Sequence, residues 1–458
     1  MTDQEPAGRP LAAELEAGLA TELATELATE PIAEPIAEPA GQLASALSGR
    51  LGPVSVEGLA RLSGGASRET WAFEAVGPGG TRTGLILRRD PQGRPSEPGA
   101  MAREAGAIGA AGAAGLAVPE VLLRADGPEL WGSPGLVMRR VDGETIARRI
   151  LRDVGYRQAR RVLVGQIGSF AAGLHALPAL PGLAASDPLR QLRETLAGLG
   201  QPSPVFDQAL AALEADPPPG REPVTVHGDL RLGNLIVGPD GLRAVIDWEL
   251  VHSGSPAEDL GWLCVKAWRF GVTPPVAGLG TREELLAAYR AAGGADIGPD
   301  ELRWWELLGT LRWGVICMTQ AQAHLSGAHR SVELAAIGRR VCEQEWDLLL
   351  LLDPEAAASA AAGRPRVTGA PLPAPAPHGR PTASELLDAV RGYLTDQVMP
   401  ATTGQLAFHA RVAANVLSIV AREIELGAIP PGPELAGQVA ARLAVANPRY
   451  FETAPPAP

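Results

Sequence analysis

The hydrophobic pattern is most regular in residues 224–250. Three short apolar runs rich in β-branched residues predict strands: 224–226, 235–237 and 244–246. Between the last two, Gly-Pro-Asp-Gly at 238–241 predicts a tight turn. Three polar side chains stand at the ends of these strands: Asp229, Asn234 and Asp247. The stretch therefore predicts strands that bring an amide and two carboxylates together.

The upstream region predicts a small sheet with two helices. Residues 41–52 place Leu43, Leu47 and Leu51 on one helical face, and residues 101–112 form a second helix with Glu104 in its first turn. Five apolar runs predict strands: 54–62, 68–73, 84–91, 119–123 and 135–143.

Beyond residue 144, and apart from the central stretch 224–250, the apolar spacing is helical to about residue 352. Three further helices are predicted near the C-terminus: 386–394, 406–426 and 434–445. We divide the chain into five segments: a disordered, acidic, low-complexity segment 1–40, a first lobe 41–140, a second lobe 141–355, an Ala/Pro-rich linker 356–380 and a small helical domain 381–452.

Composition and charge exclude several classes of function. The 458 residues are 46% apolar but only 4% aromatic, so the core is expected to consist mainly of Leu, Val and Ala. The net charge of −12 argues against non-specific nucleic-acid binding, because phosphates are repelled. No apolar run is long enough to cross a membrane, and the N-terminus lacks a basic secretory signal, so we expect a cytoplasmic protein. Three widely spaced cysteines fit no zinc or disulfide spacing and are expected to be buried: Cys264, Cys317 and Cys342.

The polar groups of the central stretch suit phosphoryl transfer. A carboxylate accepts or orients the proton of the attacking hydroxyl, and an Asn five residues later holds Mg²⁺ together with a second Asp. Asp229 and Asn234 have this spacing, and Asp247 follows the hairpin. The alternative is a surface hairpin with scattered carboxylates. No G-x-x-x-x-G-K-[ST] sequence occurs, which disfavours a P-loop NTPase.

The sequences His227-Gly-Asp229-x-x-x-x-Asn234 and Ile-Asp247-Trp-Glu resemble the aminoglycoside phosphotransferase family. The resemblance covers about residues 41–355 and implies a bilobal, protein-kinase-like α+β fold. Residues 381–452 resemble a helical domain of unknown function found appended to bacterial phosphotransferases. We expect this domain to dock on the second lobe, or to provide a homodimer or partner contact.

The resemblance also implies roles for individual residues. Asp229 is expected to act as the base, His227 to orient the loop through a backbone hydrogen bond, and Asn234 and Asp247 to bind Mg²⁺. Asp259 is expected to brace the catalytic loop. The groups expected to bind ATP are a glycine-containing loop, a basic residue with its acidic partner and a segment that meets the adenine: Gly64, Gly65, Ala66, Ser67, Arg88, Glu104, Met138, Arg139 and Val141.

The basic residue departs from the family pattern. Kinase-like enzymes usually use a lysine there, but the only lysine of this chain is Lys266. Arg88 stands at the position of that lysine, and Arg89 is the alternative. Both could instead be solvated arginines on an edge strand, with no role in phosphate binding.

The predicted reaction is ATP-dependent phosphorylation of a small-molecule hydroxyl. The Ser-Gly-Gly-Ala-Ser-Arg-Glu-Thr-Trp loop and the Leu-Arg-Arg strand look closer to the branch fused to acyl-CoA dehydrogenases, which favours a hydroxyacyl-CoA-like acceptor over an aminoglycoside-like one. The missing lysine favours an alternative, a weak nucleotide-binding pseudokinase that acts as a scaffold. A protein kinase is disfavoured because residues 247–259 are too short for an activation segment. The sequence leaves ATP and GTP undistinguished.

Overall fold

The computed structural model describes residues 31–32, 37–62, 68–91, 96–178, 180–329, 331–365, 383–427 and 434–453. The chain divides into two compact units. The first contains residues 1–191, 218–270 and 274–306, and the second contains residues 192–217, 271–273 and 307–458, as far as they are described.

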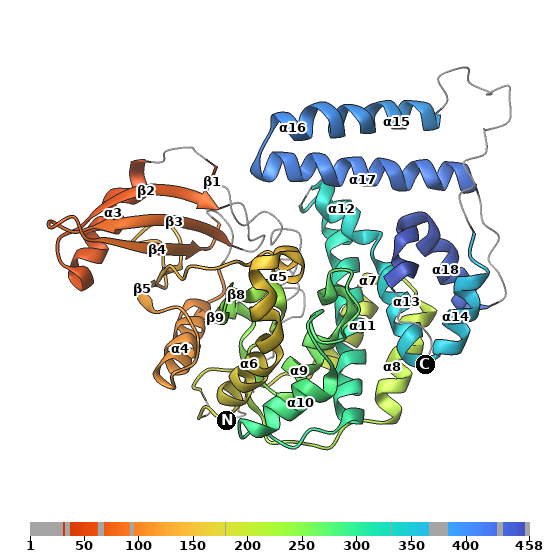
Figure 1. The fold of residues 1–458 in the computed structure, drawn as a ribbon, viewed down its shortest axis with the longest axis horizontal. Coiled ribbons are helices and arrows are strands. Elements are labelled where there is room, and N and C mark those ends of the chain that lie inside the picture. The colour runs from red at the N-terminus through yellow and green to blue at the C-terminus, as the bar shows by residue number, and fades with distance from the viewer. Residues whose placement is uncertain are drawn as a thin grey trace, which may run out of the picture. The chain divides into compact units, whose positions relative to one another are not determined.

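The first unit begins with an antiparallel sheet in the order β1-β2-β3-β4-β6-β5 (Figure 1). Its strands are β1 (Pro31–Ile32), β2 (Ser55–Leu62), β3 (Glu69–Val76), β4 (Arg82–Arg89), β5 (Val121–Ala125) and β6 (Gly135–Arg139). The five predicted strands are therefore present. The short strand β1 was not predicted; it lies in the segment expected to be disordered, most of which is outside the described residues.

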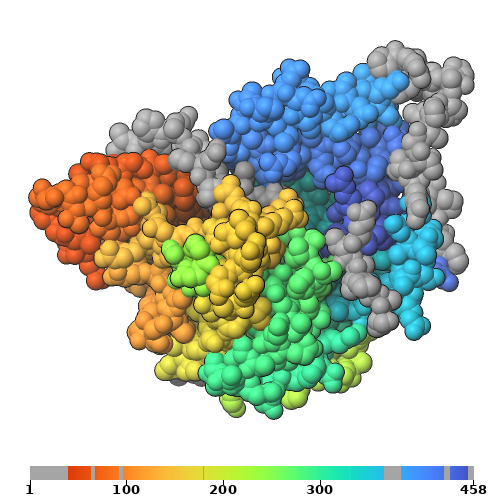
Figure 2. All heavy atoms as spheres, in the orientation of Figure 1, coloured from red at the N-terminus to blue at the C-terminus, as the bar shows by residue number. Residues whose placement is uncertain are grey.

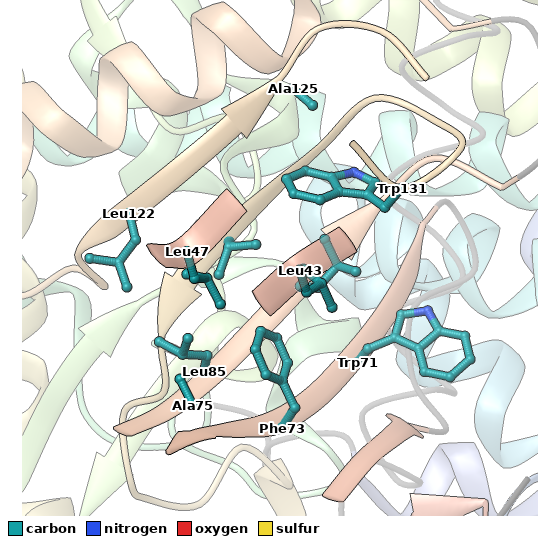
Figure 3. Close-up of a cluster of buried hydrophobic side chains, with 11 residues drawn as sticks. Leu43, Leu47, Trp71, Phe73, Ala75, Leu85, Leu122, Ala125 and Trp131 are labelled. Carbon is teal, nitrogen blue, oxygen red and sulfur yellow. The ribbon is translucent and has the colours of Figure 1, made fainter. Parts of the chain in front are cut away.

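One face of this sheet forms a core with helix α3 (Ala37–Leu51), as Figure 3 shows. Leu43 and Leu47 of the helix are fully buried against alternate residues of β3, such as Trp71 and Phe73. The alternation arises because successive side chains of a strand point to opposite faces. The same rule decides which β4 residues face the core and which face the other way.

The rest of the first unit is mainly helical and carries the central stretch. Its three predicted strands are confirmed as β7 (Val224–Val226), β8 (Leu235–Gly238) and β9 (Gly241–Val245). β8 pairs with β9, whereas β7 pairs with β10 (His252–Gly254), a strand that the sequence did not predict. The tip of the β8–β9 hairpin reaches the surface, where it shows as a small green patch beside the yellow of α5 (Ala147–Arg152) and α6 (Arg157–His175) (Figure 2). The remaining helices of this part are α4 (Ala100–Ala113), α9 (Pro256–Cys264) and α10 (Arg282–Ala291).

The second unit is a set of helices. They are α8 (Pro204–Ala215), α12 (Val332–Gly338), α13 (Val341–Leu352), α14 (Pro354–Ala362), α15 (Ala383–Tyr393), the π-turn Leu394–Val398, α16 (Met399–Ala401), α17 (Gly404–Leu426) and α18 (Leu435–Ala446). Two further helices, α7 (Pro188–Leu199) and α11 (Pro299–Leu325), run from one unit into the other.

The C-terminal helices pack on helices of their own chain. α18 packs on α13 and α14, and α17 packs on α12. Helix α14 occupies the start of the segment predicted to be a linker, and residues 366–382 of that segment lie outside the described residues.

The three cysteines are buried and free, as predicted. None of the helices in the described part of the chain has the length and apolar character needed to cross a membrane.

Candidate active site

The loop between β7 and β8 is held in one conformation by its own backbone and by His227. Gly228 has a φ of 82°, and a Cβ there would lie 2.5 Å from the carbonyl oxygen of Leu250, so only glycine fits. The ring Nε2 of His227 donates to the carbonyl oxygen of Ile246 (3.1 Å), and its Nδ1 accepts from the backbone N–H of Asp229 (3.2 Å). The hydrogen bonds expected of His227 are therefore present.

Asp259 holds the backbone of this loop through two hydrogen bonds. Its Oδ2 accepts from the backbone N–H of His227 (2.9 Å) and its Oδ1 from that of Gly228 (3.0 Å). His175 approaches Oδ2 at 3.2 Å and binds the hydroxyl of Tyr289 through its other ring nitrogen. Although burial opposes ionisation, these hydrogen bonds and His175 hold the pKa of Asp259 below its usual value.

Asp229 is buried among hydrogen-bond donors. Its Oδ1 accepts from Arg231 Nε (3.0 Å) and from Trp262 Nε1 (2.8 Å), and its Oδ2 accepts from Asn234 Nδ2 (2.6 Å). Burial raises the pKa of Asp229, and the charge of Arg231 offsets this only in part. The result is a fixed carboxylate whose proton affinity is higher than that of an exposed aspartate.

Asn234 and Asp247 offer oxygen ligands to a cation. Because the amide nitrogen of Asn234 donates to Asp229, its Oδ1 points elsewhere; it is buried and has no hydrogen-bond partner among the described residues. Asp247 adopts a left-handed backbone conformation (φ 70°), which costs free energy in a residue other than glycine and is typical of functional sites. Oxygen ligands from one carboxylate and one amide suit Mg²⁺, which takes its remaining ligands from phosphates and water. A closed cage of three or more His, Cys, Asp or Glu side chains is absent from the described part of the chain.

Arg88 connects the sheet to this site. Its Nη1 donates to Glu104 (3.1 Å) and its Nη2 to Asp247 (2.7 Å). Burial alone would lower the pKa of Arg88, but Asp247 and Glu104 raise it above its ordinary value, so the side chain stays charged. Helix α4 begins at Ala100, which places Glu104 in its second turn and corrects the predicted first-turn position.

Arg89 faces the opposite side of β4. Its Nε donates to Glu69 (2.9 Å) and its Nη1 to the carbonyl oxygen of Trp131 (2.7 Å). Arg89 shares this face with Leu85 and Leu87 of the core. Of the two candidate arginines, the structure thus brings only Arg88 to the carboxylates of the site.

Sequence reasoning missed Arg68 and Glu249. Arg68 binds Glu104 in a buried ion pair, and its Nε donates to Asp90 (3.0 Å). Glu249 lies 3.6 Å from both Arg68 and Arg88. Burial and the neighbouring Asp247 raise the pKa of Glu249. Two signals were available: Arg68 directly follows the glycine-containing loop, and Glu249 is the last residue of the Ile-Asp-Trp-Glu motif.

The remaining residues predicted to bind the nucleotide are the loop Gly64–Ser67 and the segment from Met138 to Val141. The loop Gly64–Ser67 lies outside the described residues. Met138 is buried in β6, and the backbone N–H groups of Arg139 and Arg140 donate to the carbonyl oxygens of Glu120 and Gly84 (both 2.9 Å). These two amides are therefore already engaged in backbone hydrogen bonds, and the adenine contact expected of this segment stays a prediction.

The sequence matches known families in two places. A profile described as the phosphotransferase enzyme family matches residues 58–305, which is more than half of the chain. A profile described as a domain of unknown function (DUF6285) matches residues 400–431, a range that contains helix α17.

Curated relatives include acyl-CoA dehydrogenase family member 11 from Gallus gallus and from Rattus norvegicus. The chicken protein is 28% identical over 223 residues, covering 46% of this chain and 28% of the relative. The rat protein is 28% identical over 244 residues, covering 46% of this chain and 30% of the relative. The matched region thus spans less than a third of the length of either relative.

Among solved structures, a candidate aminoglycoside phosphotransferase from Ralstonia eutropha JMP134 is similar. The two chains are 20% identical with a TM-score of 0.53, and the similarity covers 69% of this chain and 98% of the other. This likeness confirms the predicted kinase-like fold, in which an antiparallel sheet lobe precedes a mostly helical lobe.

Proposed function

Because the chain belongs to the phosphotransferase enzyme family, we propose that it transfers the terminal phosphoryl group of ATP to a hydroxyl group of a small molecule. One observation carries this proposal. The buried carboxylate of Asp229 is held by the amide nitrogen of Asn234, whose oxygen is left without a partner among the described residues. A base and a metal ligand are thereby fixed relative to each other.

Asp229 accepts the proton in the proposed step. The acceptor's hydroxyl oxygen forms a bond to the γ-phosphorus, the bond from that phosphorus to the β–γ bridging oxygen breaks, and ADP leaves with the electron pair. The hydroxyl proton passes to the Asp229 carboxylate, whose raised pKa makes it a better base than an exposed aspartate.

Asn234 Oδ1 and the Asp247 carboxylate would hold Mg²⁺, which supplies positive charge to the phosphates during transfer. In the structure, Arg88 donates a hydrogen bond to one carboxylate oxygen of Asp247. We expect Arg88 to bind a phosphate when the nucleotide arrives, with Glu104 fixing its position. The glycine-containing loop Gly64–Ser67 is proposed to cover the phosphates.

The acceptor is proposed to be a hydroxyacyl-CoA-like metabolite. The name of the two vertebrate relatives, which belong to an acyl-CoA dehydrogenase family, supports this choice. An aminoglycoside-like alcohol is supported by the family resemblance alone. The buried, free cysteines agree with the reducing cytoplasm that we propose as its compartment.

The test is a screen for Mg²⁺-dependent ATP consumption by the full chain. Hydroxyacyl-CoAs, aminoglycosides, macrolides and choline-like alcohols serve as acceptors. We expect turnover with one class, and a loss of at least about 100-fold in Asp229→Asn and Asp247→Ala, because general-base catalysis and metal binding each contribute about this much.

Asp240→Asn is the matched control, since Asp240 lies at the exposed tip of the β8–β9 hairpin and should not affect turnover. Undiminished turnover in Asp247→Ala would show that Asp247 is not a required Mg²⁺ ligand. If no acceptor is used but ATP raises the melting temperature, the nucleotide-binding scaffold becomes the better hypothesis.

A further inference from the structure

The guanidinium group of Arg231 is buried with most of its donors unused. Arg231 is 0% exposed, and its Nε donates to both carboxylate oxygens of Asp229, at 3.0 and 3.2 Å. Neither Nη1 nor Nη2 has a hydrogen-bond partner among the described residues. These two nitrogens carry four N–H donors, and leaving a buried charged donor unpaired is costly.

Two tryptophans fix the position of this guanidinium. The Cζ of Arg231 lies 4.9 Å from the centre of the Trp268 ring, a cation–π distance. Trp268 packs against Trp262 with ring centres 5.0 Å apart, and Trp262 donates to Asp229. Arg231 is therefore held at its Nε edge by Asp229 and on its face by Trp268, and its Nη edge is the part with no hydrogen-bond partner among the described residues.

We propose that the Nη edge of Arg231 binds an anionic oxygen group, a phosphate or a carboxylate, beside Asp229 during the reaction. This inference rests on the proposed function. Two sources supply this chemistry: the phosphoryl group in transfer, or an acidic group of the acceptor.

The number of donors favours an anion over water. A water molecule accepts at most two hydrogen bonds, whereas the two oxygens of a phosphate or carboxylate match the fork of a guanidinium and accept several. The location also fits, because Arg231 donates to Asp229, the base of the proposed transfer.

The test compares Arg231→Gln with the wild-type full chain by titration calorimetry, using Mg²⁺-ADP and a Mg²⁺-bound non-hydrolysable ATP analogue. If Arg231 binds the phosphoryl group in transfer, the variant loses affinity for the triphosphate by at least about tenfold, the size expected for hydrogen bonds to a charged group. Its affinity for ADP should stay within about twofold, which a general loss of structure would not produce.

A second arm detects the acceptor as the source. In that case both nucleotide affinities are unchanged, while the KM for an acidic acceptor from the screen rises about tenfold and that for a neutral analogue does not. Inorganic phosphate serves as a probe that needs no acceptor: we expect it to raise the melting temperature of the wild type but not of Arg231→Gln.

Arg243→Gln is the matched control, because Arg243 is an exposed arginine of the neighbouring β8–β9 hairpin and should behave as wild type in every arm. If Arg231→Gln does not fold, Arg231→Lys replaces it. Lysine keeps the positive charge and the aliphatic part of the side chain but lacks the paired donors of the guanidinium, so the same affinities should fall by a smaller factor. Wild-type behaviour of the Arg231 variant towards both nucleotides, phosphate and acceptor would overturn the proposal. Failure of the wild type to bind Mg²⁺-ATP would instead count against the proposed function, while the phosphate arm would still test Arg231.

Discussion

Arg68 and Arg88 share a buried cluster with four carboxylates: Asp90, Glu104, Asp247 and Glu249. The carboxylates outnumber the arginines, so each arginine contacts more than one carboxylate. In this cluster Arg68 binds Glu104 and Asp90, and Arg88 is the cation that also reaches Asp247. Arg68 thus contacts Glu104 independently of Arg88, which is consistent with the proposed role of Arg88 as a phosphate ligand.

Arg68→Gln is expected to lower the free energy of unfolding by about 3–5 kcal/mol, because removing one partner of a buried ion pair leaves the other charge uncompensated. Arg82→Gln is the control: Arg82 pairs with Glu57 at the surface, with about half of each side chain exposed, and should change stability by less than about 1 kcal/mol. Urea unfolding of both variants provides the comparison. A cost for Arg68→Gln no larger than that for Arg82→Gln would show that the cluster does not depend on Arg68.

At the scale of elements, local patterns explain what the sequence predicted. Strands β7, β8 and β9 have apolar runs and turn residues within one stretch, so their existence and order were predictable. Strand β10 has the sequence His-Ser-Gly, carries no such pattern, and is a strand because it pairs with β7. The hydrogen bond from Trp262 to Asp229 joins residues 33 positions apart, and the cation–π contact of Arg231 is made with the distant Trp268. Neither contact leaves a local signal in the sequence.

The contact between α12 and α17 contains a carboxylate that gives a pH-dependent prediction. Burial raises the pKa of Glu333 to about 7. An acid whose pKa is higher in the folded than in the unfolded state binds more protons when folded, so the protein loses stability as the pH rises from about 4.5 to about 7. The side chain is 17% exposed, so we expect a loss of about 2–3 kcal/mol, somewhat below the full effect of the shift.

Glu333→Gln should therefore be more stable than the wild type at pH 8 and nearly equal to it at pH 4.5, as measured by urea unfolding. Glu425→Gln, an exposed glutamate near the end of α17, is the control and should leave the pH dependence of the wild type in place. The interpretation is wrong if the gain from Glu333→Gln is the same at both pH values.

At the scale of the whole molecule, the C-terminal helices complete the burial of α13. Three of its carboxylates are at most 5% exposed: Glu343, Glu345 and Asp347. Each has a partner from the C-terminal segment, namely Asn447 (3.0 Å), Arg442 (2.8 Å) and Tyr450 (2.6 Å), respectively. Trp346 also packs against Phe451, with ring centres 5.1 Å apart. The C-terminal helices therefore belong to the fold of the second unit, and the expected dimer or partner contact through them stays a prediction.

A chain ending at residue 365 is expected to lose most of its soluble yield, because α13 would expose apolar surface and its three carboxylates would lose these partners. Size-exclusion chromatography and thermal unfolding measure the effect. Tyr450→Phe removes only one hydrogen bond to a charged group and should cost about 1–3 kcal/mol while the chain stays soluble and folded. If the truncated chain instead unfolds at the same temperature as the full chain, α13 does not need the C-terminal helices, and residues 383–458 act as a separate module.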